Sequence, residues 1–263
     1  MNEDFEILIV DDEQVIVESI HKICGFLNHS VITATSSTEA LEILNRKKIS
    51  LIVADIMMPE VNGFDFLSEI IRLNIPTPVI LTSGNASLDI IHRSFSLGAI
   101  DFLPKPFSFD ELESFIVRGL SASELLKAKR LRFNSIQDLI FITCPSNYKK
   151  FGKWNWLSSD NNIIKIGLSD FLIKTIGTIQ KIVFKEVGEN IVISEMCIEI
   201  VDSNNLTHNI ISPISGVILE INRKVLENHS ILEKDPYFEG WIYKLKCSNF
   251  SFEEKYLLSC TSE

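Results

Sequence analysis

Two patterns of apolar and polar residues divide the sequence. Up to about residue 120, short continuous apolar runs alternate with segments in which apolar residues recur at helical spacing. Continuous runs of strand length indicate strands that are buried on both faces of a parallel sheet, and the segments between them would supply the helices. The pattern predicts helices at about 14–27, 37–47, 63–73 and 87–97, and a last one that begins at Phe109 with Ser108 as its cap. We therefore expect an α/β domain with a doubly wound parallel sheet.

Four of the apolar runs end in reactive side chains. Asp11 and Asp12 follow Ile7–Val10, Asp55 follows Leu51–Ala54, Thr82 follows Pro78–Leu81, and Lys105 follows Ile100–Pro104. Because the carboxyl ends of parallel strands meet at one edge of a sheet, we expect these side chains to form one site. Neighbouring carboxylates repel one another unless a cation lies between them, and both Mg²⁺ and Lys105 suit that position.

The residue types in this group point to phosphoryl transfer. Asp55 stands alone at its strand end, which suits an aspartate nucleophile that accepts a phosphoryl group. Mg²⁺ and Lys105 would neutralise the phosphoryl oxygens, and Thr82 would donate a hydrogen bond to one of them. A single Asp after an apolar run is more often a turn or helix-cap residue. Four such placements in this order favour the site over that simpler interpretation.

Several short motifs accompany these side chains. They are Met57-Met58-Pro59 and Gly63 after Asp55, Ser83-Gly84 after Thr82, Gly98-Ala99, and Pro106-Phe107 after Lys105. With these motifs, residues 4 to about 120 resemble the receiver domain of two-component response regulators. The resemblance implies a five-stranded sheet of the flavodoxin or CheY-like kind and phosphorylation of Asp55 by a histidine kinase. It also implies a Mg²⁺ site that is formed by Asp11, Asp12, Asp55 and the backbone carbonyl of Met57.

The same resemblance implies how the site would act as a switch. Thr82 would follow the phosphoryl group inward, and Phe102 would change rotamer with it. The sequence departs from the family here, because Phe102 lacks the hydroxyl group of the Tyr that many members carry. Met57 has no polar side chain that could position an attacking water, so we predict slow self-dephosphorylation. The Lys105–Pro106 bond is expected to be cis by family analogy.

Composition and charge narrow the class of protein. The 263 residues are 46% hydrophobic, which is ample for one large or two ordinary domains. Residues 1–120 hold 18 acidic and 8 basic side chains, a net charge of 8 − 18 = −10, while residues 121–263 hold 17 of each. This argues against nucleic-acid binding by the first half, and the second half shows no clustered basic face. With no signal-like start and no apolar run near ~18 residues, we expect a cytoplasmic protein without membrane insertion.

The five cysteines are widely spaced and form no Cys-x-x-Cys motif. They are Cys24, Cys144, Cys197, Cys247 and Cys260. This spacing indicates neither a zinc site nor a disulfide framework, so buried reduced thiols are expected. A redox-sensing pair is the less favoured alternative.

Helical spacing continues past residue 120 toward the basic cluster Lys127–Arg132, which we interpret as a solvated helix face near the helix end. Thr143–Asn147 indicates a break, and the second pattern begins beyond it. The expected domains are a receiver at 1–121, a helical extension and linker at 122–153, a β domain at 154–250 and a C-terminal tail at 251–263.

Short alternating runs rich in Ile and Val fill residues 154–247, with glycines between them. This pattern predicts a compact β-sandwich or flattened barrel. Five pieces of the segment are distinctive: Lys165–Phe171, Ile176–Ile179, Glu186–Gly188, Ser212–Gly216 and Glu233–Trp241. In that order they resemble the glycine cleavage system H protein, which implies the lipoyl-domain fold.

The family's lipoylated lysine lies at a hairpin tip, a fixed distance before its Ser-Pro-x-Ser-Gly motif. Counting back from Ser212 places Asn205 at that position, and Glu186–Arg223 contains no lysine. An amide cannot carry the lipoyl arm, so we expect no lipoate and no carrier function. A spacer or dimerisation module and a partner- or ligand-binding surface then remain equally open. The aromatic candidates for such a surface are Trp154, Trp156, Trp241 and Tyr243.

We therefore expect a response regulator that is not an enzyme beyond its own phosphotransfer and dephosphorylation. A sensor histidine kinase or phosphotransfer protein would phosphorylate Asp55, with Thr82 and Lys105 assisting. The output would be a contact with an unidentified downstream protein, and a homodimer stays open. A regulated carrier or ligand-binding protein of one-carbon or lipoyl metabolism is the alternative, which Asn205 opposes. A transcription factor would need a helix-turn-helix motif, which the sequence does not show.

Overall fold

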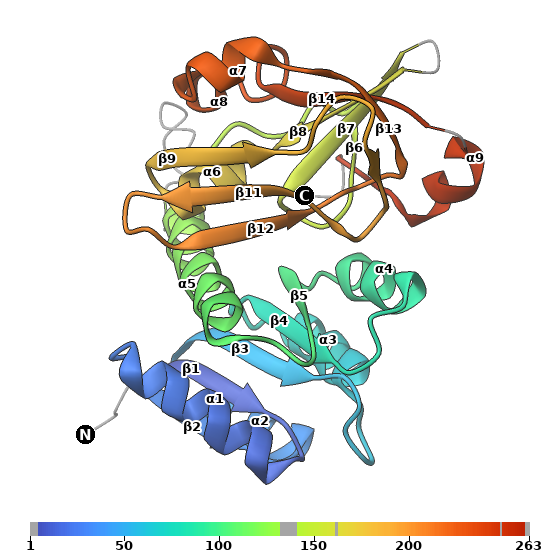
Figure 1. Cartoon of the computed structure of the whole chain (residues 1–263). Helices are drawn as coiled ribbons and strands as arrows, with labels where there is room; N and C mark the ends of the chain where they lie inside the picture. Colours follow the sequence, from blue (N-terminus) through green and yellow to red (C-terminus); the bar gives the residue numbers. More distant parts are fainter. Residues whose placement is uncertain (1–4, 132–140, 161–162, 248, 261–263) are drawn as a thin grey trace. The chain divides into compact units, whose positions relative to one another are not determined.

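The computed structural model describes residues 5–131, 141–160, 163–247 and 249–260. The chain forms two compact units, Met1–Lys127 and Ala128–Glu263 (Figure 1). Within the described residues, no helix has both the length and the apolar character needed to cross a membrane.

The first unit is a five-stranded parallel sheet with helices between its strands. The strands are β1 (Phe5–Val10), β2 (Val31–Ala34), β3 (Ile49–Asp55), β4 (Val79–Ser83) and β5 (Asp101–Pro104), in the order β2-β1-β3-β4-β5. The helices are α1 (Gln14–Phe26), α2 (Ser37–Arg46), α3 (Gly63–Arg72), α4 (Leu88–Ser96) and α5 (Phe109–Leu131). The strand order changes direction at β1, which places helices on both faces of the sheet. The predicted doubly wound fold is confirmed.

Burial and capping explain why these residues form these elements. Ile7–Val10 have no exposed surface, and every residue of β4 is buried, as expected for strands covered on both faces. Ser108 caps α5 as predicted, because its Oγ accepts the Glu111 N–H at 3.2 Å. The Glu111 carboxylate accepts the Ser108 N–H in return at 2.8 Å, which completes a capping box.

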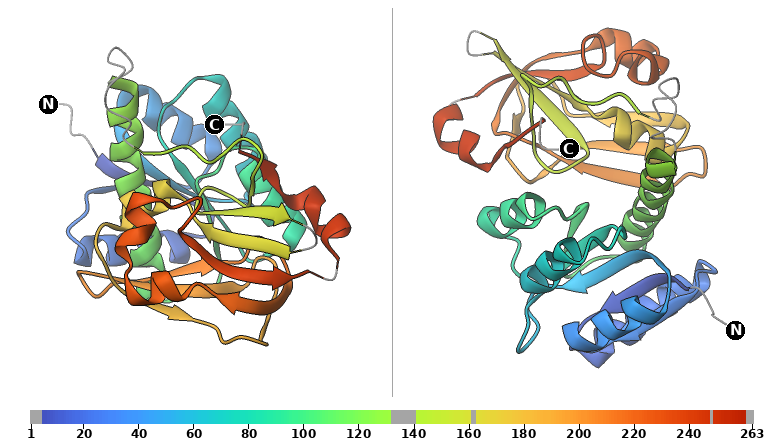
Figure 2. Two further views of the ribbon diagram at one scale, coloured as in Figure 1. Left: turned by 90° about the horizontal axis from the view of Figure 1, so that it is seen from above. Right: turned by 180° about the vertical axis from the view of Figure 1, so that it is seen from behind.

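The second unit contains two antiparallel sheets. Seven strands form the first, in the order β10-β13-β14-β8-β7-β6-β15, and three form the second, in the order β12-β11-β9. The strands of the first sheet are β6 (Lys149–Lys150), β7 (Asn155–Asp160), β8 (Ile163–Leu168), β10 (Asn190–Ile191), β13 (Gly216–Ile221), β14 (Trp241–Lys246) and β15 (Leu258–Ser259). The remaining elements are β9 (Ile179–Phe184), β11 (Met196–Asp202), β12 (Thr207–Ile211), α6 (Asp170–Ile176), α7 (Arg223–Glu227), α8 (Ser230–Lys234), α9 (Phe250–Glu253) and the 3₁₀-helix η1 (Glu254–Tyr256). The views in Figures 1 and 2 show the sheets as two layers, in agreement with the predicted sandwich.

Trp156 is one of the largest side chains in the core of the second unit. Its indole is 1% exposed and donates hydrogen bonds to the carbonyl oxygens of Leu168 and Pro236 at 3.0 and 3.1 Å. Gly167 lies so close to the indole ring that a Cβ atom there would overlap it. Trp154 and Tyr243 are buried as well, so most of the aromatic candidates for a binding surface are core residues.

Parts of the expected linker and tail belong to the fold of the second unit. Strand β6 lies in the segment expected to be a linker, and it pairs with β15, which lies in the segment expected to be a tail. Two-residue strands carry no periodic signal, so the sequence pattern could not reveal them. Residues 132–140 of the expected linker lie outside the described residues.

The expectation of reduced thiols is wrong for one pair of cysteines. Cys144 and Cys260 form a disulfide, with their Cα atoms 5.6 Å apart at a sequence separation of 116. The pairing of β6 with β15 brings them together, and spacing along the chain contains no sign of it. Cys24 and Cys197 are buried thiols, as expected, and Cys247 is a partly buried thiol.

Candidate functional site

The carboxyl edge of the parallel sheet gathers the predicted side chains. Asp11 directly follows β1, and Asp55 is the last residue of β3, where it stands in register with Thr82 of β4. Lys105 directly follows β5, and its backbone N–H donates to the Ser83 carbonyl oxygen at 2.8 Å. The Lys105–Pro106 bond is cis. Neighbouring strands therefore bring together residues that are far apart in the sequence.

Lys105 bridges the two buried carboxylates. Its Nζ lies 2.7 Å from Asp11 Oδ2 and 2.6 Å from Asp55 Oδ1. Asp11 is 1% exposed and Asp55 is 4% exposed, so both charges depend on this ammonium group and on nearby hydrogen bonds. The predicted position of a cation between carboxylates is thus filled by the lysine.

Backbone N–H groups bind the remaining oxygens of these carboxylates. Asp55 Oδ2 accepts the Met57 N–H at 2.5 Å, and Asp11 Oδ1 accepts the Glu13 N–H at 3.0 Å. Asp12 is exposed beside them, and the Met57 side chain points its apolar surface to solvent. The metal-ligand roles of Asp12 and of the Met57 carbonyl remain predictions.

The electrostatics of the site favour an additional cation. Burial raises the pKa of Asp11, and the contacts with Lys105 only partly offset this effect. The pKa of Lys105 is raised above its usual value. Burial by itself would lower this pKa, but the hydrogen bonds to Asp11 and Asp55 together outweigh the effect of burial. The Lys105 ammonium group therefore does not fully offset the burial of the Asp11 carboxylate.

The donor set fits a Mg²⁺ ion that would share the site with a phosphoryl group. Within the described part of the chain, no three His, Cys, Asp or Glu side chains are gathered into a complete metal cage. Mg²⁺ does not require one, because it commonly uses one or two carboxylates together with waters and phosphate oxygens. Asp11 and Asp55 provide such a pair and already hold a cationic group between them.

The predicted switch residues lie inside the sheet. Thr82 is 1% exposed, and Phe102 is 5% exposed on β5, where it stands in register with Leu81. The Phe102 ring therefore has no free path to solvent. Any change of its rotamer would need space within the surrounding core.

Asn205 lies at the tip of the hairpin that joins β11 and β12. It is exposed, and its φ of 63° places it in the left-handed region. Asp202 holds the turn from inside, because its Oδ1 accepts the N–H groups of Asn204 and Leu206 at 2.8 and 2.9 Å. The structure thus places Asn205 on an ordered, exposed turn.

Two protein families match this chain, one in each unit. The response regulator receiver domain matches residues 7–117, and the glycine cleavage H-protein matches residues 147–262. The chain belongs to both families. It joins a receiver domain to an H-protein domain.

Two relatives agree with this division, one for each domain, and one solved structure is similar to the first unit. The chain is 38% identical over 112 residues to the probable glycine cleavage system H protein 1 of Saccharolobus solfataricus, a match that covers 43% of the chain and 80% of that protein. It is 43% identical over 107 residues to the response regulator SaeR of Staphylococcus aureus, which covers 40% of the chain and 46% of SaeR. The crystal structure of a CheY-like receiver domain from Methanospirillum hungatei is 29% identical, with a TM-score of 0.44, and the match covers 46% of this chain and 98% of that one.

An open cleft of about 800 Å³ adjoins Asp55 in the receiver domain. One wall is the apolar side of α1, and the other is the loop after Lys105. The apolar residues that line it include Ile16, Ile20, Ile23, Met57, Pro106 and Phe107. The phosphoacceptor candidate is therefore reached from a largely apolar surface.

Two buried pairs of ionisable side chains were not predicted from the sequence. In the receiver domain, Arg118 Nη2 donates to Asp101 Oδ2 at 2.8 Å. In the H-protein domain, His208 Nε2 lies 3.5 Å from Oδ2 of Asp202, the residue that holds the hairpin turn. The sequence contains one indication of such a pair, the acidic residue Asp101 within an apolar run. It does not indicate which residue would pair with it.

Proposed function

We propose that this protein is a response regulator in which a histidine kinase or a phosphotransfer protein phosphorylates Asp55. The observation that carries the proposal is the buried Asp55 carboxylate, held by Lys105 beside a second carboxylate at the sheet edge. One Asp55 oxygen would bond to phosphorus as the phosphorus–nitrogen bond of the donor's phosphohistidine breaks. The donor keeps that electron pair on its imidazole nitrogen.

The residues around Asp55 would stabilise the product. Lys105, which already contacts Asp55 Oδ1, would pair with a phosphoryl oxygen, and Thr82 would donate its hydroxyl to another. Phosphorylation adds about −1.5 to −2 charges at neutral pH. A bound Mg²⁺, held by Asp11 and Asp55, would offset part of that charge. Thr82 and Phe102 would then move together as the switch.

The cleft beside Asp55 supports a protein as the phosphoryl donor. Its apolar wall on α1 repeats at helical spacing through Ile16, Ile20 and Ile23. Such a wall suits the apolar face of a partner helix, which would bring its histidine over the carboxylate. A small-molecule donor would make no use of this surface.

The H-protein domain would act as the output through contacts with another protein. Asn205 stands at the exposed hairpin tip, and the surrounding stretch Glu186–Arg223 contains no lysine that could be acylated. The carrier chemistry of the family is therefore not part of this first proposal. We propose a non-lipoylated domain that exposes a binding surface.

Hydrogen exchange on the full-length protein with Mg²⁺ tests this function. Exchange is compared with and without beryllofluoride, a phosphoryl mimic, over residues 5–120 and 154–247. We expect beryllofluoride to protect amides around Asp55 and Lys105 and to alter exchange in the H-protein domain. The matched control is Asp55→Asn, which keeps the side-chain shape and should not respond. A wild-type protein that does not respond would overturn the assignment of Asp55, and a response confined to residues 5–120 would overturn the output role.

A carrier linked to lipoyl metabolism is the second candidate, and the intact, exposed β11–β12 hairpin favours it. Intact mass of the protein after expression with a lipoylation system decides between the two. We expect no lipoyl adduct on the wild-type chain. An adduct on the wild type would establish the carrier, while an adduct only on Asn205→Lys would show that the hairpin is recognised but has lost its acceptor.

A further inference from the structure

One disulfide ties the beginning of the H-protein domain to its end. Cys144 lies shortly before β6, and Cys260 directly follows β15. The two strands pair over two residues each. Next to this ladder, the Cys260 N–H donates one long hydrogen bond to the Tyr148 carbonyl oxygen, at 3.4 Å. So short a ladder provides little stabilisation by itself. The disulfide is therefore the strongest link between these two segments.

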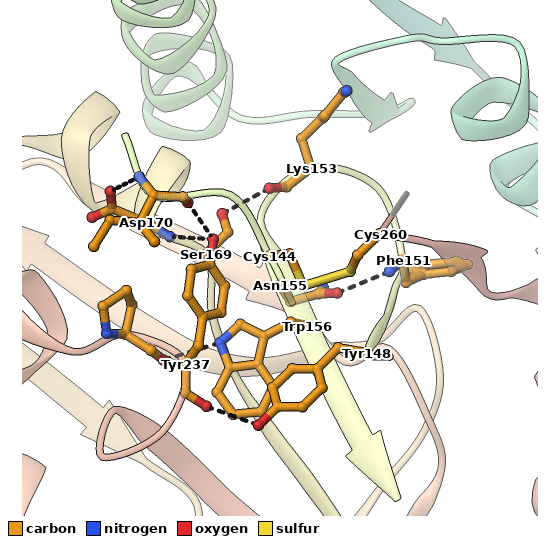
Figure 3. Close-up of a disulfide and its surroundings, with 12 residues drawn as sticks. Cys144, Tyr148, Phe151, Lys153, Asn155, Trp156, Ser169, Asp170, Tyr237 and Cys260 are labelled. Carbon is orange, nitrogen blue, oxygen red and sulfur yellow. Dashed lines mark hydrogen bonds between the residues drawn. A yellow bond between two sulfur atoms is a disulfide. The ribbon is translucent and has the colours of Figure 1, made fainter. Parts of the chain in front are cut away.

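Aromatic side chains surround the two sulfur atoms (Figure 3). Cys144 and Cys260 form a buried cluster with Trp156 and Tyr237, and Tyr148 packs against it. Cys144 is 9% exposed and Cys260 is 4% exposed. This cover excludes bulky reagents, but β15 pairs with β6 over only two residues, and a small opening of β15 would expose the bond.

The other cysteines indicate the conditions under which the protein works. Cys24 and Cys197 are buried thiols, and burial raises the pKa of each to about 12. Cys247 is a partly buried thiol. Since three of its five cysteines are thiols, we infer that the protein works where thiols stay reduced. Disulfides in such surroundings are usually transient rather than structural.

We propose that the Cys144–Cys260 disulfide is a site of thiol–disulfide exchange, at which a small dithiol reductant releases β15 from β6. The first thiolate of the dithiol attacks one sulfur, the Cys144–Cys260 bond breaks, and a mixed disulfide forms. The second thiol of the reductant then displaces the protein sulfur and closes the reductant's own disulfide. Two electrons and two protons pass to the protein, which keeps two thiols. This exchange is independent of the proposed phosphoryl transfer.

Reduction would loosen a defined segment and leave the rest of the core in place. Glu253 is anchored separately, because its Oε2 accepts the Ser215 N–H at 2.7 Å. The next residue, Glu254, forms a half-exposed pair with Lys149, which provides little stabilisation. Tyr256 and Leu257 lie within residues 254–260 and are buried, so we expect reduction to loosen this segment, which comprises η1 and β15, rather than to unfold the core around it.

The test is a redox titration of the full-length protein without denaturant. The protein is equilibrated at several ratios of reduced to oxidised dithiothreitol, its free thiols are alkylated, and intact mass gives the fraction reduced. Hydrogen exchange is measured on the same samples. We expect a reversible two-thiol transition, at least tenfold faster exchange over 254–260 in the reduced form, and unchanged exchange over Cys197–Val201. Reduction that occurs only in denaturant, or that leaves exchange over 254–260 unchanged, would overturn the proposal.

Two variants sharpen the test. Cys247→Ser should titrate as the wild type does, and loss of the transition in this variant would assign the exchange to Cys247 and refute the proposal. Cys144→Ser removes the link permanently, so it should show the fast exchange over 254–260 at every dithiol ratio. If Cys144→Ser does not fold, the wild-type titration still decides, because it needs no substitution.

Discussion

The buried ion pair between Asp101 and Arg118 offers the sharpest test of how the receiver domain is held together. Arg118 is 1% exposed on α5, and Asp101 is 5% exposed at the start of β5. Asp101 Oδ1 also accepts the N–H of Phe102, the proposed switch residue, at 2.9 Å. Arg118 donates further to Ser114 at 3.0 Å. The pair therefore fixes the strand that carries the switch to the helix that leaves the domain.

Replacing Arg118 by Met would leave the Asp101 carboxylate buried with its main counter-charge removed. Breaking one side of a buried pair costs about 3–5 kcal/mol, because the remaining charge is not compensated. The double variant Asp101→Asn with Arg118→Met leaves no charge buried, and the Asn oxygen can still accept the Phe102 N–H. It should regain about 1.5–3 kcal/mol relative to Arg118→Met alone.

Hydrogen exchange of β4 and β5 amides in the full-length protein measures this effect without requiring the two domains to unfold together. A loss of 3–5 kcal/mol corresponds to roughly 150-fold to 4,000-fold faster exchange for amides that open with the domain. The matched control is Arg72→Met, which removes an exposed helix pair with Glu69 and should change exchange little.

Two results would refute this reasoning. If Arg118→Met accelerates exchange no more than Arg72→Met, the buried pair does not hold the strand. The stability losses of Arg118→Met and of Asp101→Asn are also measured separately. If the loss of the double variant equals their sum, the two side chains do not interact, and the loss in Arg118→Met has another source.

Three further predictions concern the candidate site of the receiver domain and the core of the H-protein domain. The phosphorylated receiver domain should persist for minutes or longer in a mass-based decay assay, because Met57 cannot position water, and a half-life of seconds would contradict this. Because burial raises the pKa of Asp11 above its ordinary 3.8, its contribution to stability is complete below that value and is lost as the pH rises through the raised pKa. Asp11→Asn should abolish this fall in a series of denaturant melts taken at rising pH from 3.8 upward, and an unchanged series would show that Asp11 is not its source. Gly167→Ala should cost the H-protein domain about 1–3 kcal/mol in calorimetry, since its Cβ would overlap Trp156. Gly25→Ala in the receiver domain, where a Cβ atom meets open space, should cost its own domain nothing comparable.

The residues at the carboxyl edge of the parallel sheet could be predicted from the sequence, because the carboxyl ends of parallel strands meet at one edge. Asp55 and Thr82 each end an apolar run, and the structure places them in register on adjacent strands. The helices could be predicted as well, since periodicity and a capping residue such as Ser108 are local signals. What a local pattern specifies was therefore available without the structure.

The long-range pairs were not available in this way. Cys144 and Cys260 are 116 positions apart and meet through strands of two residues, which have no period to detect. Asp101 and Arg118 are 17 positions apart and lie on different elements, and only the packing of α5 against β5 decides that they meet. In both cases the contact depends on register and packing, which neither composition nor spacing encodes.

The hairpin tip bears on the proposal that the H-protein domain acts as an output without carrier chemistry. Asn205 occupies the left-handed region with a φ of 63°, and Asn adopts that region at lower cost than Lys. The Asp202 carboxylate fixes the same turn through two backbone hydrogen bonds. A swinging arm needs a long, mobile side chain, whereas this tip combines a short amide with a held backbone. A turn of constant shape suits recognition by a partner, as the proposed output role requires.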